Sequence, residues 1–96
     1  MVRGEWAVAV CRHVQYSGQV QGVGFRYAVQ RLASGFPVAG FVRNLRDGSV
    51  EVVAEGAAED VERFLTSIAR QMAPYITQSQ ARDEPSAGYK GFDIRY

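Results

Sequence analysis

An Asp47-Gly48 dipeptide stands between two largely apolar runs, residues 41–45 and residues 49–54. An Asp-Gly dipeptide between two such runs is a strong signal of a β-hairpin. We therefore expect two antiparallel strands joined by a tight turn. The hairpin constrains the fold strongly, because the segments on either side of it have the periodicity of helices.

Two segments with helical periodicity flank the expected hairpin. From Phe25 onwards apolar residues recur at the spacing of one helix face, and Gly35 and Pro37 follow as the usual signals of a helix end. A second pattern of this kind follows Gly56, has acidic residues in its first turns, where the helix dipole favours them, and stops at Pro74. The apolar positions of the two expected helices are Phe25, Ala28, Val29, Leu32 and Ala33, then Val61, Phe64, Leu65, Ile68 and Met72.

Three further segments complete the expected sheet. Alternating residues predict a first strand over about residues 8–17 and a last strand over residues 91–96, and residues 76–82 form a fourth strand with weaker alternation. The order of elements predicts an α+β protein with the ferredoxin-like β-α-β-β-α-β plait, an antiparallel sheet with two helices on one face. We expect a single domain over residues 1–96, in which residues 1–6 form a loose N-terminal extension.

Composition restricts the partners and the compartment of the chain. A formal net charge of +1 produces no bulk field that would attract nucleic acid or anionic lipid. The single cysteine, Cys11, cannot form an internal disulfide and is expected to be a small buried apolar residue. The apolar run over residues 6–11 is too short for a signal-peptide core or a membrane span. We therefore expect a cytoplasmic monomer with no membrane or nucleic-acid partner.

The segment between the first strand and the first helix has the composition of an anion site. Residues 18–24 contain three glycines, and Arg26 follows on the expected first turn of the helix. Backbone N–H groups at a helix N-terminus lack intrahelical acceptors and carry partial positive charge, so a phosphate can accept hydrogen bonds from several of them. Gly22 and Gly24 allow the backbone to approach an oxygen closely. A guanidinium can hold phosphate through two parallel hydrogen bonds.

The residues of this loop leave a second interpretation open, a structural turn in which the glycines relieve strain and Arg26 is solvated. They do argue against two nucleotide-binding motifs. No Lys-Ser/Thr pair follows the glycines, as it would in a P-loop, and Tyr27 occupies the position of the third glycine of a dinucleotide-binding motif.

Two motifs resemble those of the acylphosphatase family. Residues 18–26 read Gly-Gln-Val-Gln-Gly-Val-Gly-Phe-Arg and resemble the family signature G-x-V-Q-G-V-x-F-R. Residues 40–44 resemble the second motif, G-W-V-x-N, with Phe41 in place of the usual tryptophan, and residues 92–96 resemble the closing strand. The resemblance covers about residues 12–96. It implies an enzyme that hydrolyses small-molecule acyl phosphates to a carboxylate and inorganic phosphate. One cysteine and one histidine cannot supply the four ligands of a structural zinc site, so we expect metal-independent catalysis without a cofactor.

The resemblance also implies which residues form the site. The implied phosphate-binding residues are Val20, Gln21, Gly22, Val23 and Gly24, through their backbone N–H groups, and Arg26. Asn44 is the implied water-orienting residue, and the bound phosphate itself is implied to assist in taking the proton of the water. Arg26 and Asn44 are therefore the expected catalytic residues, and a phosphate or sulfate ion can occupy the site.

Several other side chains are expected to have no catalytic role. His13 has no evident charge partner, so we interpret it as a surface or edge residue and not as a base. Arg43 and Arg46 are interpreted as solvated charges of the hairpin. Three aromatic residues near the C-terminus are expected to pack against the fold: Tyr89, Phe92 and Tyr96.

Two other functions are compatible with the same order of elements. One is a binding module without useful turnover; acylphosphatase-like domains also occur at the start of large hydrogenase-maturation proteins. The other is RNA binding, because RNA-recognition domains share this order and stack bases on aromatic residues of their third strand. The corresponding segment here, residues 50–54, contains no aromatic residue, which argues against RNA.

Overall fold

A five-stranded sheet with the order β4-β1-β3-β2-β5 forms the frame of the molecule. The structure is a computed structural model, and it describes residues 9–96. The strands are β1 (Ala9–Gly18), β2 (Ala39–Asn44), β3 (Val50–Ala57), β4 (Ile76–Glu84) and β5 (Phe92–Arg95). The central strand, β3, is buried along most of its length, because both of its faces are covered.

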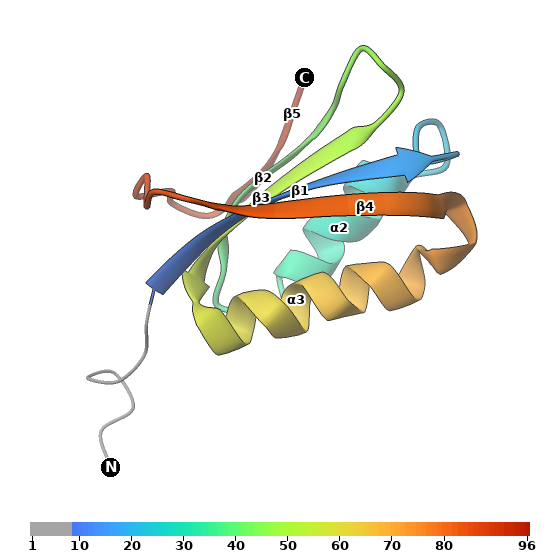
Figure 1. Cartoon of the computed structure of the whole chain (residues 1–96). Helices are drawn as coiled ribbons and strands as arrows, with labels where there is room; N and C mark the ends of the chain where they lie inside the picture. The colour runs from blue at the N-terminus through green and yellow to red at the C-terminus, as the bar shows by residue number, and fades with distance from the viewer. Residues whose placement is uncertain (1–8) are drawn as a thin grey trace.

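Two helices, α2 (Phe25–Ala33) and α3 (Ala58–Gln71), lie on the same face of this sheet (Figure 1). A short 3-10 helix, η1 (Ala73–Tyr75), connects α3 to β4. The expected ferredoxin-like plait is therefore confirmed, with β5 as an additional strand beyond the six elements of the motif.

The expected antiparallel sheet is correct for every strand pair except one. β5 runs parallel to β2, with Val42 opposite Ile94, and the sheet is consequently mixed. The chain leaves β4 at one edge of the sheet and enters β5 at the other edge. This crossing brings β5 in beside β2 in the same direction, a long-range relation that local alternation does not encode.

The main core lies between the sheet and the helices. Most of its helix positions agree with the expected ones: Phe25, Ala28, Val29 and Ala33 of α2 and Val61, Phe64 and Ile68 of α3 are buried, as is Met72 just after α3. The other two expected positions, Leu32 and Leu65, are partly buried against the same core. The strands contribute alternate residues to it, among them Val14, Val42 and Val52. Burial of these apolar side chains is the principal force that holds the helices on the sheet.

A second, smaller cluster covers part of the opposite face of the sheet. Cys11, Phe41 and Val53 are buried there, and Tyr89 packs on them from the connection between β4 and β5. The carboxylate of Glu55 holds this connection by accepting hydrogen bonds from backbone amides, including that of Tyr89 at 2.9 Å. The expectation for Cys11 is confirmed, and Phe41 keeps a packed position where the family has tryptophan.

Most expected boundaries agree with the structure to within two residues. The first strand begins at Ala9 within the described residues, and β4 extends to Glu84, two residues beyond its expected end. The expected N-terminal extension, residues 1–6, lies outside the described residues. Between residues 9 and 96, no helix is long and apolar enough to cross a membrane.

Candidate active site

The connection between β1 and α2, residues 19–24, is anchored in the core at one end and open at the other. Val20 is fully buried in the main core, whereas Gly22, Val23 and Gly24 are exposed. Gly22 and Gly24 have φ angles of +79° and +78°, in the left-handed region that other residues avoid. A Cβ atom at either position would meet nothing within 4 Å, so the backbone angle and not lack of space favours glycine.

Gly24 is also the N-cap of α2, and no side chain caps this helix end. The first intrahelical hydrogen bond runs from the Ala28 N–H to the Gly24 carbonyl at 3.0 Å. The N–H groups of residues 25–27 therefore have no acceptor inside the helix. No acidic residue lies in the first turn, and Arg26 does, so the partial positive charge of the helix end is reinforced by a full one.

The side chain of Gln21 joins this loop to the hairpin of β2 and β3. Its Nε2 group donates one hydrogen bond to the Leu45 carbonyl at 2.7 Å and a second to the Ser49 carbonyl at 2.9 Å. Both protons of the amide are thereby used, and both acceptors belong to the turn that follows Asn44. Sequence reasoning assigned Gln21 only a backbone contact, because a side-chain bond across 24 residues has no local signal.

The turn of the hairpin is itself held by side chains. The Asp47 Oδ1 atom accepts hydrogen bonds from the backbone N–H of Ser49 at 2.9 Å and from its hydroxyl at 2.5 Å. Gln15 of β1 donates to the Ser49 hydroxyl at 2.9 Å. The two bonds from Ser49 keep the pKa of Asp47 below its usual value, since they favour the charged carboxylate. Side-chain hydrogen bonds therefore fix the turn next to Asn44, to which Gln21 of the loop before α2 is bonded.

Asn44 is the last residue of β2, and its neighbour Arg43 points to the opposite face of the sheet. Asn44 shares the side of Val42, which lies in the helix-covered core. The Oδ1 atom of Asn44 is buried and has no hydrogen-bond partner among the described residues. A buried acceptor in this condition is unusual and points to a donor from outside the chain.

Arg26 lies against the ring of Tyr96, with its guanidinium carbon 4.9 Å from the ring centroid. A guanidinium in contact with a ring can still donate its N–H groups to other acceptors. Tyr96 itself is 86% exposed. The expectation that it packs into the fold is therefore wrong, whereas Tyr89 and Phe92 do pack against buried clusters.

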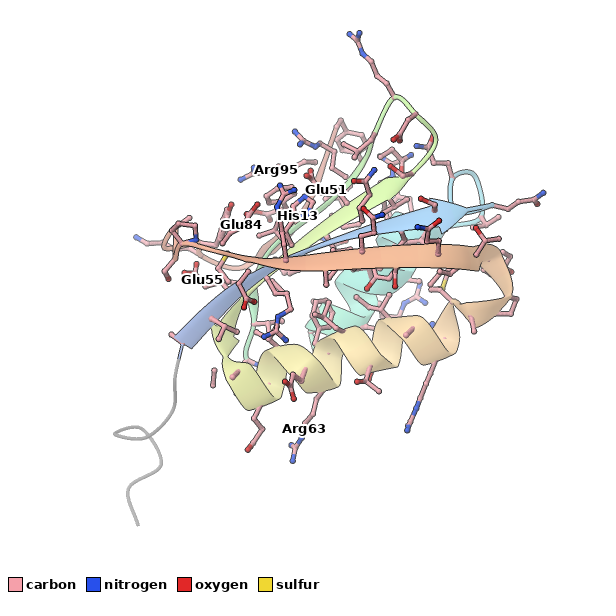
Figure 2. The ribbon with its side chains drawn as sticks, in the orientation of Figure 1. His13, Glu51, Glu55, Arg63, Glu84 and Arg95 are labelled. Atoms are coloured by element: carbon pink, nitrogen blue, oxygen red, sulfur yellow. The ribbon has the colours of Figure 1, made fainter. Side chains whose placement is uncertain are left out.

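The expectation for His13 is also wrong, because this residue is buried and has a charge partner. Its Nε2 atom lies 2.5 Å from the Glu51 Oε2 atom, and Arg43 donates to the other carboxylate oxygen of Glu51 at 2.6 and 3.0 Å. Figure 2 shows His13 and Glu51 on the side of the sheet away from α3. Strand pairing between β1 and β3 brings the two residues together, so a pattern within one strand could not show it. Arg43 is thus an ion-pair partner and not a solvated charge.

Comparisons with known proteins settle the family. The sequence model of the acylphosphatase family matches residues 12–94. The chain belongs to the acylphosphatase family. A curated acylphosphatase of Methanospirillum hungatei is 46% identical over 81 residues, which are 82% of this chain and 89% of the relative. The crystal structure of acylphosphatase from Bacillus subtilis superposes with a TM-score of 0.82 at 32% identity and covers 91% of this chain and 99% of that chain.

As a member of the acylphosphatase family, this protein hydrolyses acyl phosphates. The same fold occurs within a longer protein: full-length HypF matches with a TM-score of 0.81 at 29% identity, over 94% of this chain and 12% of that one. Between residues 9 and 96, no group of three or more His, Cys, Asp or Glu side chains could hold a metal ion.

The expected site residues fall on two neighbouring parts of this acylphosphatase. Val20, Gln21, Gly22, Val23, Gly24 and Arg26 lie in the loop and the first turn of α2, and Asn44 lies at the end of β2. The Gln21 hydrogen bonds join these two parts directly after Asn44. The arrangement combines unpaired backbone donors, a guanidinium and an amide acceptor, which are the groups needed to hold an anion and a water molecule.

Proposed function

We propose that this acylphosphatase binds the phosphoryl group of its substrate on the backbone N–H groups of residues 20–24 and on Arg26, and that Asn44 orients the attacking water. The observation that carries the proposal is the left-handed Gly24 at the uncapped start of α2, two residues before Arg26. An uncapped helix start with a cationic side chain and no acidic one is a site built for an anion.

The phosphoryl oxygens accept hydrogen bonds from the loop, while the edge of the Arg26 guanidinium binds two of them in parallel. Charge on these oxygens changes as the transition state forms, and donors that are already in place stabilise it without further reorganisation. Gly22 and Gly24 allow the backbone to hold the N–H groups in this arrangement. Their positive φ angles cost glycine little, whereas a residue with a side chain would be strained there.

Asn44 would bind the attacking water through its side-chain oxygen. Its buried Oδ1 atom lacks a protein donor among the described residues, and a water O–H is a donor of the right size. A neutral amide also suits this position, because a carboxylate there would repel the phosphate. The orphan acceptor thus supports a role for Asn44 toward the nucleophile and not toward the phosphate.

The reaction needs no covalent intermediate. The water oxygen attacks phosphorus, the bond between phosphorus and the acyl oxygen breaks, and its electron pair leaves with the carboxylate. The proton of the water passes to a phosphoryl oxygen, so the products are a carboxylate and inorganic phosphate. The only histidine, His13, is not needed as a base and is bonded to Glu51 on the other face of the sheet.

We also propose that the enzyme acts as a cytoplasmic monomer and that inorganic phosphate or sulfate occupies the same site as a competitor. A lone buried cysteine is in keeping with a reducing compartment. Sedimentation velocity tests the monomer, and inhibition by phosphate in a steady-state assay tests the shared site.

The RNA-binding alternative is not favoured. The third strand of an RNA-recognition domain presents aromatic residues on the open face of the sheet. In β3 this face carries Glu51, Val53 and Glu55, and the two carboxylates are engaged by protein donors. Acidic residues there would repel an RNA backbone.

The test is a steady-state assay of acetyl phosphate and benzoyl phosphate hydrolysis with a chelator present, for the wild type and Arg26→Ala side by side. We expect turnover by the wild type and a loss of about 10³-fold in kcat/KM for the variant, because a transition-state charge donor is removed. Circular dichroism verifies that the variant is folded. A folded Arg26→Ala protein with near-normal rates contradicts the site, and an inactive wild type at micromolar concentration favours a binding module.

A further inference from the structure

Exposed apolar side chains gather around the proposed phosphate site. Among the described residues, the large apolar side chains that stay exposed are Val23, Tyr27, Tyr75 and Tyr96. Val23 belongs to the anion loop, Tyr27 follows Arg26 on the first turn of α2, and Tyr96 contacts Arg26. Scattered exposed apolar residues are normal, but a cluster beside a binding site points to a contact surface.

The two tyrosines of this cluster hold each other in place. The pKa of Tyr96 is raised by a side-chain hydrogen bond with Tyr27, and the face of the Tyr96 ring lies against the Arg26 guanidinium. The two rings are 57% and 86% exposed for Tyr27 and Tyr96, so most of their surface stays accessible despite these contacts. A ring that is positioned by two contacts and still open is suited to receive a ligand.

The position of the rings follows from the way Arg26 would bind phosphate. The guanidinium can give its face to Tyr96 and its edge to the phosphoryl oxygens at the same time. A phosphoryl group bound at the edge of the Arg26 guanidinium would then lie beside the Tyr96 ring, because the ring centroid is 4.9 Å from the guanidinium carbon. No acidic side chain lies in the first turn of α2, so no carboxylate of this turn would repel a phosphorylated ligand.

We propose that Val23, Tyr27 and Tyr96 bind the acyl group of the substrate and that the enzyme favours acyl phosphates with an aromatic acyl group. The inference rests on the proposed phosphate site, because it uses Arg26 as the point of attachment. Flat rings contact another ring over a larger area than they contact a methyl group, and aromatic pairs add a favourable orientation term. Tyr96 and Tyr27 are therefore specificity residues and not part of the phosphoryl chemistry.

The first experiment compares kcat/KM for benzoyl phosphate and acetyl phosphate in four proteins. These are the wild type, Tyr96→Ala, Tyr27→Ala and a control variant, Tyr75→Ala, whose exposed ring lies in η1. We expect the ratio of the two kcat/KM values to fall about fivefold in Tyr96→Ala and in Tyr27→Ala, the order of magnitude of one lost aromatic contact. The ratio should stay unchanged in Tyr75→Ala. A fifth protein, Tyr27→Phe, keeps the aromatic ring and should retain most of the ratio of the wild type.

The ratio separates this role from an effect on Arg26. If Tyr96 only positions the guanidinium, Tyr96→Ala weakens both substrates alike and also weakens inhibition by inorganic phosphate. An unchanged ratio in both alanine variants therefore overturns the proposal, whatever the absolute rates.

A binding measurement without turnover distinguishes this proposal from the proposed function. Benzylphosphonate and ethylphosphonate carry the same charged group, and their affinities for the wild type and Tyr96→Ala can be measured by calorimetry. We expect tighter binding of benzylphosphonate to the wild type and a loss of that advantage in the variant. Equal affinities for the wild type overturn the acyl-group surface, and no binding of either compound overturns the phosphate site itself.

Discussion

The side-chain amide of Gln21 donates a hydrogen bond to the carbonyl of Leu45, 2.7 Å away, and so ties the loop before α2 to the residue that follows Asn44. A second bond to the Ser49 carbonyl makes the link bidentate. The two halves of the proposed site come from distant parts of the chain, and this one side chain sets their separation. Catalysis by positioning depends on such distances, because small displacements of reacting groups are costly.

Replacing Gln21 by methionine keeps the size of the side chain and removes both donors. We expect the free energy of unfolding to fall by about 1–3 kcal/mol, since two carbonyls lose their partners. We also expect kcat/KM for acetyl phosphate to fall at least tenfold, since the loop and Asn44 are no longer held together. Urea unfolding and steady-state kinetics measure the two effects. Gln19→Met, at an exposed position of the same loop, is the control and should change neither.

Arg26→Lys keeps the positive charge but loses the planar fork that binds two oxygens in parallel. We expect a loss of about 10²-fold in kcat/KM, smaller than that of Arg26→Ala, because one point charge still attracts the anion. Measurements of kcat/KM for Arg26→Lys and Arg26→Ala, at low and at moderate ionic strength, test whether the lysine variant loses less activity than the alanine variant. Equal activity of lysine and arginine would show that charge alone is required.

Asn44→Ala removes the acceptor that the proposal assigns to the water. We expect kcat to fall about 10²-fold or more, while the inhibition constant of inorganic phosphate changes less than about threefold. Steady-state kinetics with inorganic phosphate as a competitive inhibitor measures kcat and the inhibition constant of phosphate separately. A parallel loss in turnover and in phosphate affinity would make Asn44 a phosphate ligand. Asn44→Asp should weaken both, because its carboxylate repels the anion.

Stability in acid should depend on Glu51. Burial opposes the charge of Glu51, but hydrogen bonds from His13 and Arg43 outweigh it and leave the pKa of the carboxyl below its ordinary value. A carboxyl with a folded pKa below the unfolded one, about 4.3 for Glu, stabilises the fold above that pH. This contribution is lost as pH falls through the folded pKa.

Urea midpoints at pH 7 and pH 3 test the role of Glu51. The wild-type midpoint should drop between the two, and Glu51→Gln should start lower at pH 7 and drop less. Some acid sensitivity should persist in the variant, since the pKa of Asp47 and that of Glu55 are also lowered by hydrogen bonds. A variant with the same pH dependence as the wild type would exclude Glu51 as a source of the acid sensitivity.

The amino-acid sequence by itself determined the order of the elements and the glycine-rich loop before α2. The spacing of Phe25, Ala28 and Val29 defines one helix face. Asp47-Gly48 marks the hairpin turn, in which Gly48 takes a positive φ angle and Asp47 does not. Gly24 before Arg26 indicates a helix start with free N–H groups. These features were predictable because each depends on residues within a few positions of one another, where periodicity, turn geometry and backbone angles act directly.

Tertiary structure alone decided which distant residues meet. It paired β5 parallel to β2, buried His13 against Glu51, and placed the Gln21 amide on the turn after Asn44. It also left Tyr96 open beside Arg26, although its place in the sequence suggested packing. These contacts depend on the register of the sheet and on the packing of the whole chain around one core. Local patterns do not contain that information, because a one-residue shift in register would reverse the face of every side chain in a strand.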